Sequence, residues 1–128
     1  MSFWNKSKDN NQEITSNDID WKLLDTEDGL NDLKTKSETK PQVIFKHSTR
    51  CSISSMAKRR LERNWNINES QVDIHYLDLI SYRSISGKVA DDFGVTHQSP
   101  QILIIKNGQA VFNTSHNDID VETIAQNL

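Results

Sequence analysis

The stretch that decides the fold runs from residue 41 to residue 54 and reads PQVIFKHSTRCSIS. Its first half, residues 41–46, is rich in β-branched and aromatic side chains, which favours a strand. After four polar residues comes Cys51, and from there apolar side chains recur at helical spacing. The sequence therefore predicts a strand, a short polar turn and a helix, with a cysteine where the helix begins.

We expect this helix to run from Cys51 to about Asn66. Its apolar stripe is expected to comprise Ile53, Ala57, Leu61 and Trp65, with Met56 beside them. Such a stripe is typical of a helix that packs one face on a sheet.

Strands and helices alternate along the rest of the chain. Upstream we expect a short alternating segment at 19–24 and a helix that starts near 26–33, capped by Thr26 or Asp25. Downstream we expect a strand at 71–78 and then a helix at 84–93, which Gly94 ends. A buried strand at 100–105 is followed by a hairpin turn at Asn107-Gly108 and a strand at 110–112. We expect a last helix that Asp118 caps. This order predicts an α/β domain with a thioredoxin-like fold, in which helices flank a central mixed sheet of four to five strands.

Length and composition narrow the function classes. The 128 residues fit one domain, for which we expect residues 19–128, preceded by a flexible polar tail at 1–18. The net charge of -3 argues against a general nucleic-acid binder, and no apolar run is long enough to span a membrane. The first residues lack the apolar core of a secretory signal, so we expect a cytoplasmic protein. The single cysteine excludes an internal disulfide.

The position of Cys51 predicts a reactive thiol. The thiolate is the nucleophilic form, and the unpaired N–H groups and dipole of a helix N-terminus favour that anion. Arg50 and Lys46 add positive charge nearby, and Ser54, one helical turn on, can donate a hydrogen bond to the thiolate. Ser54 also occupies the place where a two-cysteine oxidoreductase carries its second thiol. The alternative is a buried structural cysteine, which the polar neighbours of Cys51 disfavour.

Ser99-Pro100 supports the same interpretation. In a thioredoxin-type fold a proline after a cis peptide bond opens the strand beside the catalytic helix, and Pro100 stands at that point. We expect a cis bond here that exposes the Ser99 backbone to an extended thiol substrate. The alternative is an ordinary trans proline at the start of a strand.

The segment FKHSTRCSIS, residues 45–54, closely resembles the active-site segment of the monothiol bacilliredoxins, the YtxJ-like proteins of bacillithiol-using Gram-positive bacteria. Trp21, Ser99-Pro100 and Asn107-Gly108 are also placed as in that family, and the resemblance covers about residues 18–128. Members often show a T-C-P-I-S pattern, whereas this chain has Arg50 in the threonine place and Ser52 in the proline place.

The resemblance implies de-bacillithiolation, in which Cys51 attacks a mixed disulfide between bacillithiol and a protein cysteine. Bacillithiol is then a co-substrate, and its anionic malate moiety would meet Arg50, Thr49, Lys46 and the helix tip. A second bacillithiol, a partner redoxin or a disulfide reductase would regenerate Cys51. We expect bacillithiolated proteins as partners, no bound cofactor or metal, no contact with nucleic acid or membrane, and a monomer.

Two other functions remain open from the sequence. A monothiol glutaredoxin-like protein can carry an iron–sulfur cluster between two subunits, which would make the purified protein brown and dimeric. A redox-inactive interaction module would keep only the fold, and its cellular role would survive Cys51→Ser.

Overall fold

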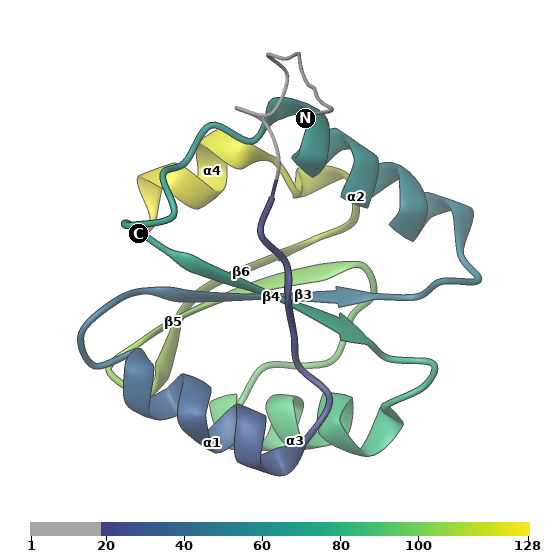
Figure 1. Ribbon diagram of the computed structural model, residues 1–128. Coiled ribbons are helices and arrows are strands. Elements are labelled where there is room, and N and C mark those ends of the chain that lie inside the picture. Colours follow the sequence, from purple (N-terminus) through teal and green to yellow (C-terminus); the bar gives the residue numbers. More distant parts are fainter. Residues whose placement is uncertain (1–18) are drawn as a thin grey trace, which may run out of the picture.

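The computed structural model describes residues 19–128, so the tail predicted at 1–18 lies outside the described residues. Helices and strands follow the predicted order (Figure 1). The elements are β2 (Lys22–Leu23), α1 (Glu27–Lys36), β3 (Gln42–His47), α2 (Ser52–Asn64), β4 (Asp73–Asp78), α3 (Arg83–Phe93), β5 (Gln101–Lys106), β6 (Gln109–Ser115), the 3-10 helix η2 (His116–Asp118) and α4 (Val121–Gln126).

The strands form one mixed sheet in the order β2-β4-β3-β5-β6. β2, β4 and β3 are parallel, whereas β5 runs antiparallel to both β3 and β6. The turn between β5 and β6 uses Asn107 and Gly108 at positive φ (54° and 74°), which is what a tight hairpin turn requires. This is the predicted mixed sheet, with five strands.

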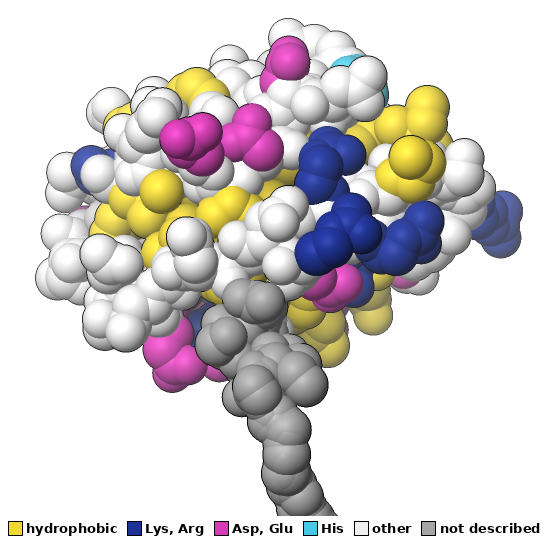
Figure 2. All heavy atoms as spheres, turned by 90° about the horizontal axis from the view of Figure 1, so that it is seen from above, with side chains coloured by type: hydrophobic (Ala, Val, Ile, Leu, Met, Phe, Trp, Pro, Cys, Tyr) yellow, Lys and Arg dark blue, Asp and Glu magenta, His cyan; other side chains and the backbone are white. Residues whose placement is uncertain are grey.

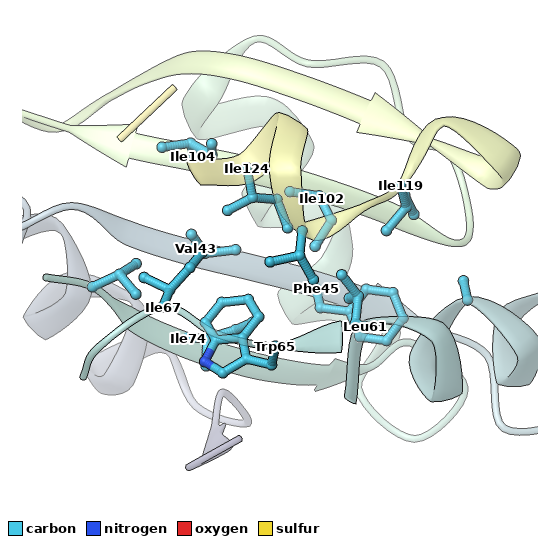
Figure 3. Close-up of a cluster of buried hydrophobic side chains, with 13 residues drawn as sticks. Val43, Phe45, Leu61, Trp65, Ile67, Ile74, Ile102, Ile104, Ile119 and Ile124 are labelled. Atoms are coloured by element: carbon cyan, nitrogen blue, oxygen red, sulfur yellow. The ribbon is translucent and has the colours of Figure 1, made fainter. Parts of the chain in front are cut away.

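Helices cover both faces of the sheet, α2 and α4 on one side and α1 and α3 on the other (Figure 1). The two faces have separate hydrophobic cores. The core under α2 and α4 contains Val43, Phe45, Leu61, Trp65, Ile102 and Ile104 (Figure 3), and the core under α1 and α3 contains Leu30, Leu33, Ile44, Leu77, Leu103 and Ile105. Each such side chain contributes about 1.5–3 kcal/mol by leaving water. Because β3 and β5 are covered on both faces, their central residues, 43–45 and 102–105, are uninterrupted apolar runs.

The helix after Cys51 differs from the prediction at both ends. Ala57, Leu61 and Trp65 are buried as expected, but Ile53 and Met56 are 53% and 56% exposed. The inward face of α2 is formed by Ser54, Ala57 and Leu61, and Ile53 and Met56 each precede a member of this set by one residue and so lie off that face. The helix ends at Asn64, two residues before the predicted end.

The last helix begins later than predicted. Residues His116–Asp118 form η2, and Asp120 rather than Asp118 caps α4, its carboxylate accepting a hydrogen bond from Thr123 N–H at 2.7 Å. Ile119, between the two acids, is fully buried and fixes where the helix can begin. Within residues 19–128, no helix has the length and apolar character needed to cross a membrane.

Candidate active site

Cys51 occupies the N-cap position of α2. Its backbone is extended (φ -108°, ψ 122°), and its carbonyl already accepts the first helical hydrogen bond, from Ser55 N–H at 3.0 Å. The thiol is free and half-buried, and it caps none of the first-turn amides. The sulfur therefore lies at the end of a helix where unpaired N–H groups and the positive end of the dipole favour a thiolate.

A tight turn connects β3 to this helix. Cys51 N–H donates to the Ser48 carbonyl at 3.2 Å, which closes the turn over two intervening residues. Those residues are Thr49 and Arg50, and both are exposed. The turn thus places a hydroxyl and a guanidinium in solvent immediately before the thiol.

The Ser54 hydroxyl is buried one turn into α2 and has two neighbours. It accepts a hydrogen bond from Ser48 N–H at 3.1 Å, and its oxygen lies 2.6 Å from Nδ1 of His47. These contacts tie the first turn of α2 to the end of β3. The sequence did not predict this contact, because no helix or strand periodicity connects residues seven apart across a turn.

The protonation of His47 decides where the Ser54 proton points. Burial, and to a lesser extent the ammonium of Lys58, lower the pKa of His47 although Asp78 and Glu62 oppose the shift, so the imidazole is neutral at neutral pH. If Nδ1 carries the ring proton, it donates to Ser54 and leaves the hydroxyl proton free, although Cys51 Sγ is not a hydrogen-bond partner of Ser54 within the described residues. If Nδ1 is bare, the hydroxyl donates to His47 instead.

Ser99 and Pro100 lie at the same end of the sheet as Cys51. Gln101 pairs with Lys46 in the antiparallel ladder, so Pro100 falls opposite His47. The Ser99-Pro100 bond is cis, as predicted. Ser99 Oγ is buried without a hydrogen-bond partner within residues 19–128, and no backbone hydrogen bond involves Ser99 in this part of the chain. The structure therefore brings Thr49, Arg50, Cys51, Ser54 and Ser99-Pro100 to one edge.

Lys46 is placed differently from the other expected site residues. It is completely buried, and its Nζ donates to the Ser86 carbonyl and to His97 Nδ1, both at 3.2 Å. Because side chains alternate along β3, Lys46 lies on the face covered by α1 and α3, whereas His47 faces α2. Its charge therefore does not lie beside the thiol.

The face around α2 has a mixed surface. Basic side chains and hydrophobic side chains lie next to each other over α2 in Figure 2. The exposed apolar residues Ile53 and Met56 follow Cys51 directly, and Arg59 and Arg63 are exposed further along the helix. Residues 19–128 contain no group of three or more His, Cys, Asp or Glu side chains that could hold a metal ion.

Known structures share this architecture. A structure described as a candidate oxidoreductase with a thioredoxin fold superimposes with a TM-score of 0.71 and 29% identity, covering 88% of this chain and 95% of that one. Thioredoxin from Fasciola hepatica (TM-score 0.65, 19% identity, 84% of this chain and 99% of that one) and from Malassezia sympodialis (0.67, 16%, 84% and 87%) share the fold. The chain thus has the thioredoxin fold.

A family model covers most of the domain. The model for the monothiol bacilliredoxin BrxC matches residues 22–124, a range that includes Cys51, Ser54 and Pro100. One cysteine in the whole chain, at the N-cap of α2 in a thioredoxin fold, agrees with the word monothiol. The protein belongs to the monothiol bacilliredoxin family and has the thioredoxin-like oxidoreductase fold.

Proposed function

We propose that the protein reduces mixed disulfides between bacillithiol and protein cysteines, using Cys51 as the nucleophile, and that it does so in the cytoplasm as a monomer. The observation that carries the proposal is the single cysteine at the N-cap of α2, half-exposed and at the same sheet edge as Ser99, whose backbone makes no hydrogen bond within residues 19–128.

The reaction has two exchange steps. The Cys51 thiolate attacks the bacillithiol sulfur of the mixed disulfide, the old S–S bond breaks, and the client cysteine leaves as a thiolate that takes a proton from water. Bacillithiol is now disulfide-bonded to Cys51. A second bacillithiol thiolate attacks the bacillithiol sulfur of this adduct, which frees Cys51 and forms bacillithiol disulfide. The net change exchanges the client mixed disulfide for bacillithiol disulfide, so the client cysteine is reduced and the incoming bacillithiol is oxidised.

The surrounding residues have distinct roles in this proposal. The Ser54 hydroxyl donates to the Cys51 thiolate when His47 holds the ring proton on Nδ1. The Ser99 backbone, next to Pro100, pairs with the extended client chain. Thr49 and Arg50, exposed in the turn, contact the polar and anionic groups of bacillithiol.

A defined client tests the proposal. A test protein with one bacillithiolated cysteine is incubated with excess bacillithiol and with wild type, Cys51→Ser or Ser52→Ala, and intact mass reports the fraction still modified. We expect wild type and the exposed-site control Ser52→Ala to accelerate loss of the adduct, and Cys51→Ser to leave it at the uncatalysed rate. Equal rates for wild type and Cys51→Ser would refute the proposal.

A further inference from the structure

The sheet face opposite Cys51 carries a small cavity of about 210 Å³. Its walls come from the residue after β4, the first half of α3 and the loop before Pro100, and consist of Leu79, Arg83, Ser86, Gly87 and His97. None of these residues has a part in the exchange steps described above.

The cavity lies at the same sheet edge as the thiol. The Leu79 N–H donates to the His47 carbonyl at 3.0 Å, and His47 is the last residue of β3 before the turn to Cys51. His97 is three residues before Pro100. In Figure 1, α2 and α3 both begin at the carboxyl ends of the parallel strands β3 and β4, on opposite faces of the sheet. The thiol and the cavity therefore lie at the same end of the sheet, on its two opposite faces.

The buried ammonium of Lys46 contacts two residues of the cavity wall, Ser86 and His97. Its two hydrogen-bond acceptors, the Ser86 carbonyl and His97 Nδ1, are both neutral, and no carboxylate of residues 19–128 forms an ion pair with it. Burial lowers the pKa of Lys46 to about 8, so it is largely protonated at neutral pH. A buried ammonium without a counter-charge is costly, and a bound anion would offset that cost.

Two of the cavity residues, His97 and Arg83, can donate hydrogen bonds to a ligand. Burial, together with the charge of Lys46, lowers the pKa of His97, so its ring is neutral at neutral pH. Since Nδ1 accepts a hydrogen bond from Lys46, the ring proton is on Nε2, which can donate to a ligand. Arg83 is exposed and forms no ion pair within the described part of the chain, and the first turn of α3 has no acid. The nearest acid along β4, Asp78, is on the opposite face, because it alternates with the buried Leu77.

We propose that this cavity binds a carboxylate of the low-molecular-weight thiol, with Arg83 and His97 donating hydrogen bonds and Lys46 supplying positive charge from behind. The inference rests on the proposed function, since the malate moiety of bacillithiol provides such carboxylates. It assigns recognition of the small thiol to α3 and the loop before Pro100, while Thr49 and Arg50 remain beside the sulfur.

Free L-malate is the probe for the cavity itself. We would titrate it into ¹⁵N-labelled wild type, Arg83→Gln and Arg63→Gln, the last being a matched control that removes one exposed arginine on α2. We expect malate to shift the amides of Ser86, Gly87 and His97 in wild type and in the control, and Arg83→Gln to weaken the apparent affinity at least about fivefold. If malate bound Arg83→Gln as tightly as wild type, or shifted only amides outside the cavity, the inference would be overturned.

A kinetic comparison separates this inference from the proposed function. The rate of Cys51 modification is measured with bacillithiol disulfide and with the neutral 2-hydroxyethyl disulfide, and the ratio of the two rates is the readout. We expect Arg83→Gln to lower the ratio about tenfold and Arg63→Gln to keep the wild-type ratio. If wild type reacts no faster with bacillithiol disulfide than with 2-hydroxyethyl disulfide, the proposed function is contradicted, independently of the malate titration. If wild type prefers bacillithiol disulfide and Arg83→Gln shows the same preference, only the carboxylate site is contradicted.

Discussion

Replacing Lys46 by methionine tests whether the buried ammonium is held at a cost to stability. Burial lowers the pKa of Lys46 from 10.5 to about 8. Because a tenfold change in proton affinity corresponds to about 1.4 kcal/mol, keeping this lysine charged in the folded protein costs about 3–4 kcal/mol. Methionine has a similar length and no charge, so Lys46→Met removes this cost.

The substitution also removes two hydrogen bonds, those to the Ser86 carbonyl and to His97 Nδ1. At about 1 kcal/mol each, they offset part of the gain. We therefore expect Lys46→Met to raise the free energy of unfolding near pH 7 by about 1 kcal/mol. The gain in stability would come with weaker malate binding, since the variant lacks the charge behind the cavity.

The difference between the two proteins should depend on pH with a definite sign. The pKa of Lys46 is lower in the folded state, so between about pH 8 and 10.5 the unfolded state binds more protons and stability rises with pH. Between pH 7 and pH 10 the free energy of unfolding of the wild type should rise by about 2 kcal/mol relative to that of Lys46→Met. Other titrating groups are common to both proteins and cancel in the difference.

Urea unfolding at the two pH values, followed by circular dichroism, measures these quantities. Lys36→Met, on the exposed side of α1, is the matched control, and its difference from wild type should be the same at both pH values. A constant difference between wild type and Lys46→Met across this range would refute the reasoning, as would a loss of more than about 3 kcal/mol at pH 7.

Three further substitutions test the fold around the site by urea unfolding. Ser54→Ala should cost about 2 kcal/mol, because it strands a buried imidazole nitrogen and a backbone N–H, whereas the neighbouring control Ser55→Ala should change stability by less than about 0.5 kcal/mol. Leu61→Ala removes a fully buried side chain from the core under α2 and should cost about 2–5 kcal/mol; a smaller loss would mean that this core is loosely packed. Asp120→Ala removes the cap of α4 and should cost about 1 kcal/mol, while Asp118→Ala should cost less; the reverse order would favour the cap predicted from the sequence.

The sequence predicted the features that depend on local patterns. The strand, turn and helix around Cys51 follow from the change of apolar spacing between residues 41 and 54, and the chain folds this way. Gly94 ends α3 with a left-handed backbone, φ 64°, because glycine adopts that conformation without steric cost. Thr26 caps α1 by accepting from Gly29 N–H at 2.9 Å, one of the two predicted options.

The features that the sequence left hidden depend on tertiary packing. Lys46 is five residues before Cys51, but successive side chains of β3 point to opposite faces of the sheet. The ammonium of Lys46 therefore lies on the face away from α2. The contact between His47 and Ser54 exists because the first turn of α2 folds back against the end of β3. The cavity beside Lys46 joins α3 to a loop ten residues further on, which no spacing rule connects.

The central claim is that Cys51 itself accepts bacillithiol from a client, and a single-turnover transfer measures it most directly. Equimolar protein and bacillithiolated client are mixed without free bacillithiol, quenched with acid at intervals, and both chains are weighed by mass spectrometry. We expect each adduct lost from the client to appear on the protein and to map to the peptide containing Cys51. A client that stays modified while the Cys51 thiol remains free would contradict it.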